Sequence, residues 1–262
     1  MGRARVTPRG LCAPRRYPNE PVLEAVLFDW GSTLMDFVWD DALVEEGHRQ
    51  GLRALRRDDP DELARLSAQF RERYLPLLHA PGTLEEVEYP GLVRELLEHV
   101  GIEASDEDLN RYLEAEHEAW NPAMQVASTS VALLEALRNR GLKTGLVSNA
   151  TDPGWLLRVD LERQGLAPYL DAVVFSSEVG KRKPHPAIFE QALSDLGVAP
   201  ERTLFVGDRL VEDVRGPAEL GMATVQAIWF RADENPDGIE PDYQAFTQMD
   251  VLNVATRLLA AA

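Results

Sequence analysis

The stretch VLEAVLFDWGSTL at residues 22–34 decides the fold of this chain. Its apolar run at 26–28 ends abruptly at Asp29, and the turn-forming residues Gly31, Ser32 and Thr33 follow. An apolar run that is too short for a helix and is closed by polar turn residues is typical of a buried parallel strand. We therefore expect Asp29 at the carboxyl end of a central strand, where open α/β sheets bind their ligands. Taken alone, the same aspartate is equally compatible with a turn residue that only makes local hydrogen bonds.

The composition is that of an ordinary globular protein, with 45% hydrophobic and 27% charged residues and a net charge of −17. Such acidity disfavours a nucleic-acid partner and favours solubility. No apolar run approaches the roughly 18 residues of a membrane helix, so we expect no membrane association. We expect a cytoplasmic protein, either a monomer or a homodimer.

The first 20 residues differ from the rest of the chain, because they are rich in arginine and proline and contain the single cysteine, Cys12. One cysteine excludes an internal disulfide and a cysteine-based metal cluster. The segment lacks the apolar stretch of a secretory signal. We expect residues 1–20 to be a disordered tail.

Apolar residues recur at helical spacing after the first strand, over residues 36–126. Four stripes predict four helices: 44–55, 63–77, 92–100 and 109–120. Pro60 and the Ser105–Asp108 pair have the positions expected of helix starts. The pattern predicts a compact helical insert.

From Thr129 onward, helical and strand patterns alternate to the end of the chain. Strands are expected at 143–148, 172–175, 203–206 and 224–229, and helices at 131–140, 155–164, 186–196, 214–220 and 251–259. Alternation of this kind predicts an α/β fold with a doubly wound, parallel, Rossmann-like sheet. Its core would comprise residues 21–35 and 127–262, and the helical insert would form a second domain.

Polar residues follow the ends of these strands, and a parallel sheet gathers them at one edge. They are Asp29, Ser148 and Asn149, Lys183, and Asp208 with Asp213. Carboxylates hold Mg²⁺, which prefers oxygen ligands and bridges to a substrate phosphate. Lys183 can neutralise the phosphate oxygens, and Ser148 can donate a hydrogen bond to them. Asp29 is then placed as a nucleophile that forms an aspartyl-phosphate.

At these positions the chain resembles the haloacid dehalogenase (HAD) superfamily, in its phosphatase-like branch with a helical cap. The resembling stretches are FDWGSTL at 28–34, LVSNA at 146–150, EVGKRKPHPAIF at 178–189 and FVGDRLVEDVRGPAELGM at 205–222. The resemblance implies an Mg²⁺-dependent hydrolase. Its implied site residues are the nucleophile Asp29, the phosphate-binding pair Ser148 and Asn149, the conserved Lys183, the metal ligand Asp208 supported by Asp213, and the backbone carbonyl of Gly31 facing the metal.

One departure from the family pattern concerns Gly31. Most phosphatases of the family have an aspartate there, two residues after the nucleophile, as general acid and base. General acid–base help is worth about 10²–10⁴ in rate, so plain alkyl phosphates should be poor substrates. A cap residue (Asp36, Asp40 or Asp41) or water could supply the missing acid. A substrate with a good leaving group would need no acid.

The departure leaves other functions open. Family branches that lack this acid include the phosphonoacetaldehyde hydrolases, the 2-haloacid dehalogenases and the ion-pumping ATPases. The first use a cap lysine, and residues 36–126 contain none. Dehalogenases need no metal, so the presence of two possible metal ligands, Asp208 and Asp213, argues against this function. Carbon–halogen or carbon–phosphorus cleavage remains an alternative, as does a low-turnover phosphate-binding protein with a regulatory role.

Several residues also have purely structural interpretations. Asp208 could be a helix cap, and the arginines at 49, 53, 56 and 57 a solvated helix face. If some of these arginines point inward, they could bind a substrate carboxylate or a second phosphate. The histidines at 48, 79, 99 and 117 are expected to be packing or surface residues, and Trp39 is close enough to the first strand to face the crevice.

Overall fold

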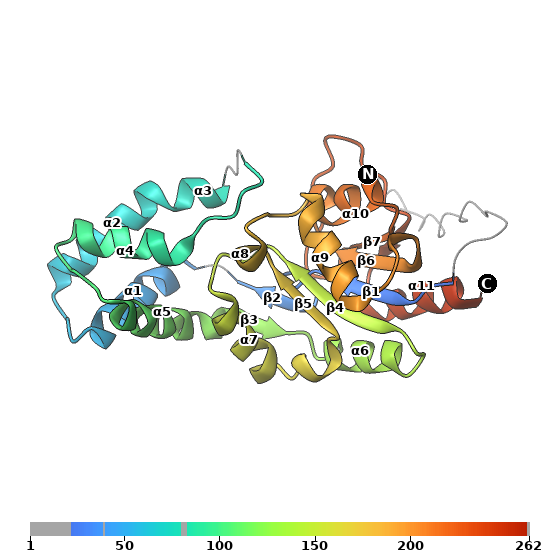
Figure 1. Cartoon of the computed structure of the whole chain (residues 1–262), viewed down its shortest axis with the longest axis horizontal. Helices are drawn as coiled ribbons and strands as arrows, with labels where there is room; N and C mark the ends of the chain where they lie inside the picture. Colours follow the sequence, from blue (N-terminus) through green and yellow to red (C-terminus); the bar gives the residue numbers. More distant parts are fainter. Residues whose placement is uncertain (1–21, 39, 80–82, 261–262) are drawn as a thin grey trace, which may run out of the picture.

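A computed structural model describes residues 22–38, 40–79 and 83–260. The predictions for residues 1–20, with Cys12, and for Trp39 lie outside the described residues. Figure 1 shows a sheet with helices on both faces and a group of helices that extends to one side of it.

The sheet has six parallel strands in the order β5-β4-β1-β6-β7-β8. They are β1 (Ala25–Phe28), β4 (Lys143–Ser148), β5 (Ala172–Phe175), β6 (Thr203–Gly207), β7 (Ala223–Ala227) and β8 (Tyr243–Ala245). The first strand lies between β4 and β6, and Phe28 pairs with Leu146 on one side and Val206 on the other. This register brings Asp29, Ser148 and Asp208 to the same edge, because each follows its paired residue by one or two positions. The predicted parallel α/β fold is confirmed.

Alternate residues of β1 face two different hydrophobic clusters, as the period of two in a strand requires. Val26 and Phe28 pack in the cluster that includes α6 (Ser130–Arg138), α7 (Gly154–Arg163) and α11 (Gln248–Ala260). Ala25 and Leu27 pack in the cluster that includes α9 (Pro186–Leu196). Two short helices, α8 (Ser176–Val179) and α10 (Gly216–Glu219), complete this part of the chain. All four residues of β1 are buried, which explains its uninterrupted apolar sequence.

The helices that follow the first strand pack around a cluster of their own. They are α1 (Asp41–Ala54), α2 (Pro60–Arg73), α3 (Leu75–His79), α4 (Tyr89–His99) and α5 (Asp106–Trp120). We call residues 41–120 the cap. The Asp59 side chain accepts a hydrogen bond at the start of α2, and Ser105 forms a capping box with Asp108 at the start of α5. The predicted helix starts at these two positions are therefore confirmed.

The two connections between cap and sheet pair with each other. Strand β2 (Met35–Phe37) runs antiparallel to β3 (Met124–Val126), with Met35 opposite Val126. The sequence did not predict this ribbon, because each strand has three residues and its partner comes from a distant part of the chain.

Three other elements differ from the sequence-based expectation. The helix predicted over 63–77 is divided, because α2 ends at Arg73 and α3 begins at Leu75. The edge strand β8 was not predicted, and it has only three residues, of which only Ala245 is buried. The helix predicted at 214–220 is a π-helical turn (Leu210–Arg215) followed by α10. Among the described residues no helix is long and apolar enough to cross a membrane.

Candidate active site

Three buried carboxylates meet at the carboxyl edge of the sheet. Asp29 follows β1, Asp208 follows β6, and Asp213 lies on the π-helical turn. Each has a carboxylate oxygen within 4.8 Å of an oxygen of the other two. Gly207 makes the approach possible, because a Cβ there would lie 2.4 Å from Cγ of Asp213. The three aspartates singled out in the sequence therefore form one cluster.

Lys183 connects two of these carboxylates. Its Nζ donates hydrogen bonds to Oδ1 of Asp29 at 2.6 Å and to Oδ1 of Asp213 at 2.7 Å. The side chain is 2% exposed. Burial lowers the pKa of Lys183, but the charges of Asp213 and Asp29 raise it more, so the net shift is upward. Lys183 is thus a permanent ammonium group in the cluster.

The cluster has the chemistry of a cation site. Burial raises the pKa of Asp208, and the negative charges of Asp29 and Asp213 raise it further. The Asp208 Oδ2 atom is buried without a hydrogen-bond partner, although Nε of Arg231 lies 3.1 Å away. A divalent cation would relieve both the repulsion and the unsatisfied oxygen, so the residues fit Mg²⁺.

Asp213 differs from the other two carboxylates, because both of its oxygens are already engaged. Its Oδ1 accepts from Lys183, and its Oδ2 accepts from the backbone N–H of Arg209 at 3.0 Å. Burial raises its pKa, and Lys183 opposes this without cancelling it. These bonds suit a residue that orients Lys183 and the loop after β6. Asp29 and Asp208 are better placed to coordinate a metal directly.

Ser148 ends β4 and Asn149 follows it, beside β1, but the two residues have different surroundings in the structure. Ser148 is buried at the end of its strand. The Asn149 side chain accepts a hydrogen bond from the backbone N–H of Lys183 at 2.7 Å and donates one to its carbonyl at 3.3 Å. Asn149 therefore holds the backbone of Lys183, and contact of either residue with phosphate stays a prediction.

Gly31 lies in the turn after Asp29, where it forms an isolated bridge with Met35. A Cβ built on Gly31 meets nothing within 4 Å, so there is room for a side chain at the position of the missing acid. Of the candidate replacements, Asp40 is exposed and caps α1 by accepting a hydrogen bond from the N–H of Ala42 at 2.8 Å. Asp36 lies on β2, opposite Gln125. That the Gly31 carbonyl faces a metal stays a prediction.

A family model described as haloacid dehalogenase-like hydrolase matches residues 23–221. The chain belongs to this family. A glyceraldehyde 3-phosphate phosphatase of Methanopyrus kandleri is 29% identical over 248 residues, covering 90% of this chain and 99% of the relative. The resemblance inferred from the four motifs is confirmed, and with it the assignment as a hydrolase of the phosphatase-like kind.

Solved structures agree with the HAD-like fold. A 2-haloacid dehalogenase from Pseudomonas syringae superimposes with a TM-score of 0.64 at 21% identity, covering 90% of this chain and 99% of that one. The HAD-hydrolase YfnB from Bacillus subtilis gives a TM-score of 0.58 at 19% identity, with coverages of 90% and 99%. At these identities the similarity establishes the fold alone.

The cap of this HAD-like hydrolase contacts the core next to the site. Tyr74 shares a hydrogen bond of 2.7 Å with Thr151, two residues after Asn149. His117 contacts Asp160 at 2.6 Å and Asp152 at 3.4 Å. Burial lowers the pKa of His117, but the two aspartates raise it to about 10. These contacts, like that of Arg231 with Asp208, were not predictable from the sequence, because no local pattern marks residues that meet only in the folded chain.

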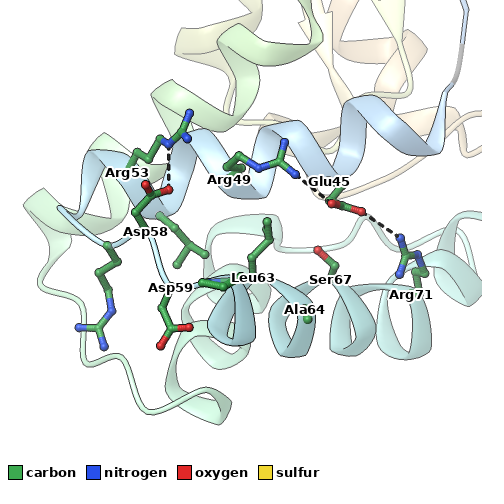
Figure 2. A pocket seen from close by; sticks show the side chains of 12 residues that line it. Glu45, Arg49, Arg53, Asp58, Asp59, Leu63, Ala64, Ser67 and Arg71 are labelled. Atoms are coloured by element: carbon green, nitrogen blue, oxygen red, sulfur yellow. Dashed lines mark hydrogen bonds and ion pairs between the residues drawn. The ribbon is translucent and has the colours of Figure 1, made fainter.

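The cap arginines do not join the cluster. Arg49, Arg53 and Arg57 line a pocket of about 400 Å³ that is formed by α1, α2 and the turn between them. Figure 2 shows Arg53 paired with Asp58, and Glu45 between Arg49 and Arg71. Since exposed pairs of this kind contribute little to stability, we interpret the group as a charged helix surface. Arg56 does not line the pocket, and His48 is a buried packing residue, as expected. His117 is also buried, but its ion pairs with Asp152 and Asp160 go beyond the expected packing role.

Proposed function

We propose that this HAD-like hydrolase is an Mg²⁺-dependent phosphatase of a small phosphorylated metabolite. The observation that carries the proposal is the placement of Asp29. Its carboxylate is buried, held by Lys183 at 2.6 Å, and adjacent to a second carboxylate, Asp208, that is suited to a metal. Nucleophile, cation and metal ligand are the parts that phosphoryl transfer requires.

Asp29 would attack the phosphorus atom, form an aspartyl-phosphate and release the alcohol or acid that carried the phosphate. Water would then hydrolyse the acyl phosphate and regenerate the carboxylate. Lys183 fixes the orientation of Asp29 and would neutralise the oxygens of the transferred group. Ser148 would donate a hydrogen bond to the same oxygens. Mg²⁺, held by Asp29 and Asp208, would supply charge stabilisation.

Gly31 restricts the substrates that such a site can use. Without an acid at this position the leaving oxygen departs as an anion or takes a proton from water. We therefore propose that good substrates are acyl phosphates or phosphates of acidic alcohols. The named activity of the Methanopyrus kandleri relative, on a phosphorylated three-carbon sugar, supports a small metabolite. We further propose a cytoplasmic monomer or homodimer. The net charge of −17 supports the absence of a nucleic-acid partner.

The test is phosphate release from a panel of phosphorylated metabolites, including acyl phosphates, with Mg²⁺ and with EDTA. The Asp29→Asn variant is the blank. Metal-dependent release that disappears in the variant supports the proposal. No release above the blank from any compound contradicts it. In that case halide release from 2-haloacids and binding of orthovanadate would distinguish a dehalogenase from a protein that only binds phosphate.

A further inference from the structure

We propose that Glu86, a cap residue between α3 and α4, is a positioning residue for the active site. The proposal rests on the proposed function, because it concerns how the phosphate pocket is held in shape. Glu86 does not approach the carboxylate cluster itself. It acts through two core loops, one that carries Ser148 and Asn149 and one that carries Lys183.

The cap segment around Glu86 is hydrogen-bonded to the core. The N–H of Glu86 donates to the carbonyl of Gly180 at 3.0 Å, and the N–H of Arg182 donates to the carbonyl of Leu84 at 2.8 Å. Between these bonds, Glu85 and Lys181 form an antiparallel bridge. The cap thus adds a short strand-like contact to the chain just before Lys183.

The side chain of Glu86 enters the core from this contact. It is 2% exposed, although the segment that carries it lies at the surface. One carboxylate oxygen accepts hydrogen bonds from Arg182 Nη1 at 2.7 Å and from the N–H of Val87 at 2.8 Å, and the other accepts from the hydroxyl of Ser176. A buried charge is costly to place unless its partners are present, and Arg182 and Ser176 are the partners that belong to the core.

Each partner of Glu86 leads to a different part of the site. Arg182 directly precedes Lys183, whose Nζ holds Asp29. Ser176 accepts a hydrogen bond from the N–H of Ala150 at 2.8 Å, and the N–H of Ser177 donates to the carbonyl of Ala150 at 3.2 Å. Ala150 is the residue after Asn149.

The same two loops are joined to each other by Asn149, through its pair of hydrogen bonds to the backbone of Lys183. Glu86, Ser176, Ala150, Asn149, Lys183 and Arg182 therefore form a closed circuit. Four of its links are hydrogen-bonded contacts, and the other two are the peptide bonds that join Ala150 to Asn149 and Lys183 to Arg182. Only one member of the circuit belongs to the cap. The contact of cap with core is thereby linked to the position of the ammonium group that holds Asp29.

Removal of Glu86 should lower turnover more than it lowers stability. A displacement of about 1 Å in a positioning element can cost about 10²-fold in rate. In Glu86→Ala we expect kcat with 4-nitrophenyl phosphate to fall about 10²-fold with little change in KM. The affinity for orthovanadate, a transition-state analogue, should fall by a similar factor.

The matched control is Glu85→Ala. Glu85 is the neighbouring residue, and its carboxylate pairs with Lys181 on the loop that carries Lys183. This pair lies at the surface, where the Glu85 side chain is 63% exposed, and it involves neither Arg182 nor Ser176. Glu86→Gln and Ser176→Ala are milder variants of the same link, and they keep the test valid if Glu86→Ala does not fold. Glu86→Gln retains an oxygen for Ser176 and should be intermediate.

Hydrogen exchange of the full chain provides a readout that does not depend on turnover. Segments 148–152 and 180–184 should exchange faster in Glu86→Ala than in the wild type. Segment 148–152, which has no link to Glu85, should remain unchanged in Glu85→Ala. If the wild type hydrolyses nothing, the proposed function fails, while exchange and vanadate affinity still test the role of Glu86. The role of Glu86 is overturned if its variants match Glu85→Ala in exchange and vanadate affinity, or if kcat falls only in proportion to the unfolded fraction.

Discussion

Replacement of Gly31 by aspartate should convert the enzyme into a more general phosphatase. The position is two residues after Asp29, and a Cβ there meets nothing within 4 Å. The backbone at Gly31 is outside the left-handed region that disfavours other residues. We therefore expect Gly31→Asp to fold like the wild type and to place a carboxyl group beside the crevice.

The size of the gain follows from what the new group can do. General acid–base catalysis contributes about 10²–10⁴ in rate, which corresponds to about 2.7–5.4 kcal/mol of barrier. An alkyl phosphate needs its leaving oxygen protonated and should gain most of this factor. 4-Nitrophenyl phosphate has an acidic leaving group and should gain little.

The assay compares kcat/KM for the two kinds of substrate in wild type, Gly31→Asp and Gly31→Asn. Asparagine has nearly the same shape as aspartate but no proton to transfer, so it isolates the acid from the effect of filling the space. An equal gain on both substrates, or an equal gain from asparagine, would refute the reasoning. So would a wild type that already hydrolyses alkyl phosphates as fast as aryl phosphates, because another group would then supply the proton.

Two further predictions concern pH and metal. His117 has a folded-state pKa of about 10 against an ordinary value of 6.5, so its stabilising effect is complete below about pH 6.5 and is lost as the pH rises through about 10. His117→Gln should lower the free energy of unfolding by about 3 kcal/mol near pH 6. Urea titrations should show that the difference in unfolding free energy between wild type and variant shrinks toward pH 10. A difference that stays constant with pH would contradict the assigned ion pairs. Because the pKa of Asp208 is raised in the folded protein, the metal-free protein becomes less stable as the pH rises above 3.8, the pKa of this carboxyl group in the unfolded chain. Protons also compete with a cation for this carboxylate. Mg²⁺ should therefore raise Tm more at about pH 8 than at about pH 5, and an equal or opposite effect in thermal scans would argue against Asp208 as a ligand.

Much of the fold was predictable, because each buried strand is marked by a short apolar run in its own stretch of the sequence. Strands β4 and β5 and helix α9 have the predicted limits. The ribbon of β2 and β3 was not predictable, since its hydrogen bonds join distant parts of the chain. The start of the predicted 214–220 helix was wrong, because the backbone after Asp208 forms a π-helical turn that brings Asp213 back toward Lys183.

The candidate site, too, was predictable only where its residues follow from local sequence patterns. The motifs identified Asp29, Lys183, Asp208 and Asp213, because chemistry at strand ends follows from the order of the strands. They assigned Asn149 to phosphate, which stays a prediction, and gave no sign that its side chain is bonded to the backbone of Lys183. They gave no sign of Glu86 or Arg231. Both residues meet their partners through tertiary contacts that no spacing in the sequence encodes.

The ribbon of β2 and β3 has a consequence for how such a chain can diversify. Because Met35 lies opposite Val126, the two ends of the helical segment are neighbours, and antiparallel neighbours are separated by only about 5 Å. The segment can be lengthened, recombined or exchanged without moving any strand of the sheet, as is usual for insertions whose ends are close. A transplanted segment would nevertheless have to bring its own acid for Ser176 and Arg182. It would also have to match Thr151, Asp152 and Asp160, which contact Tyr74 and His117. Exchange of the segment would thus be limited by a few side-chain contacts rather than by the junction.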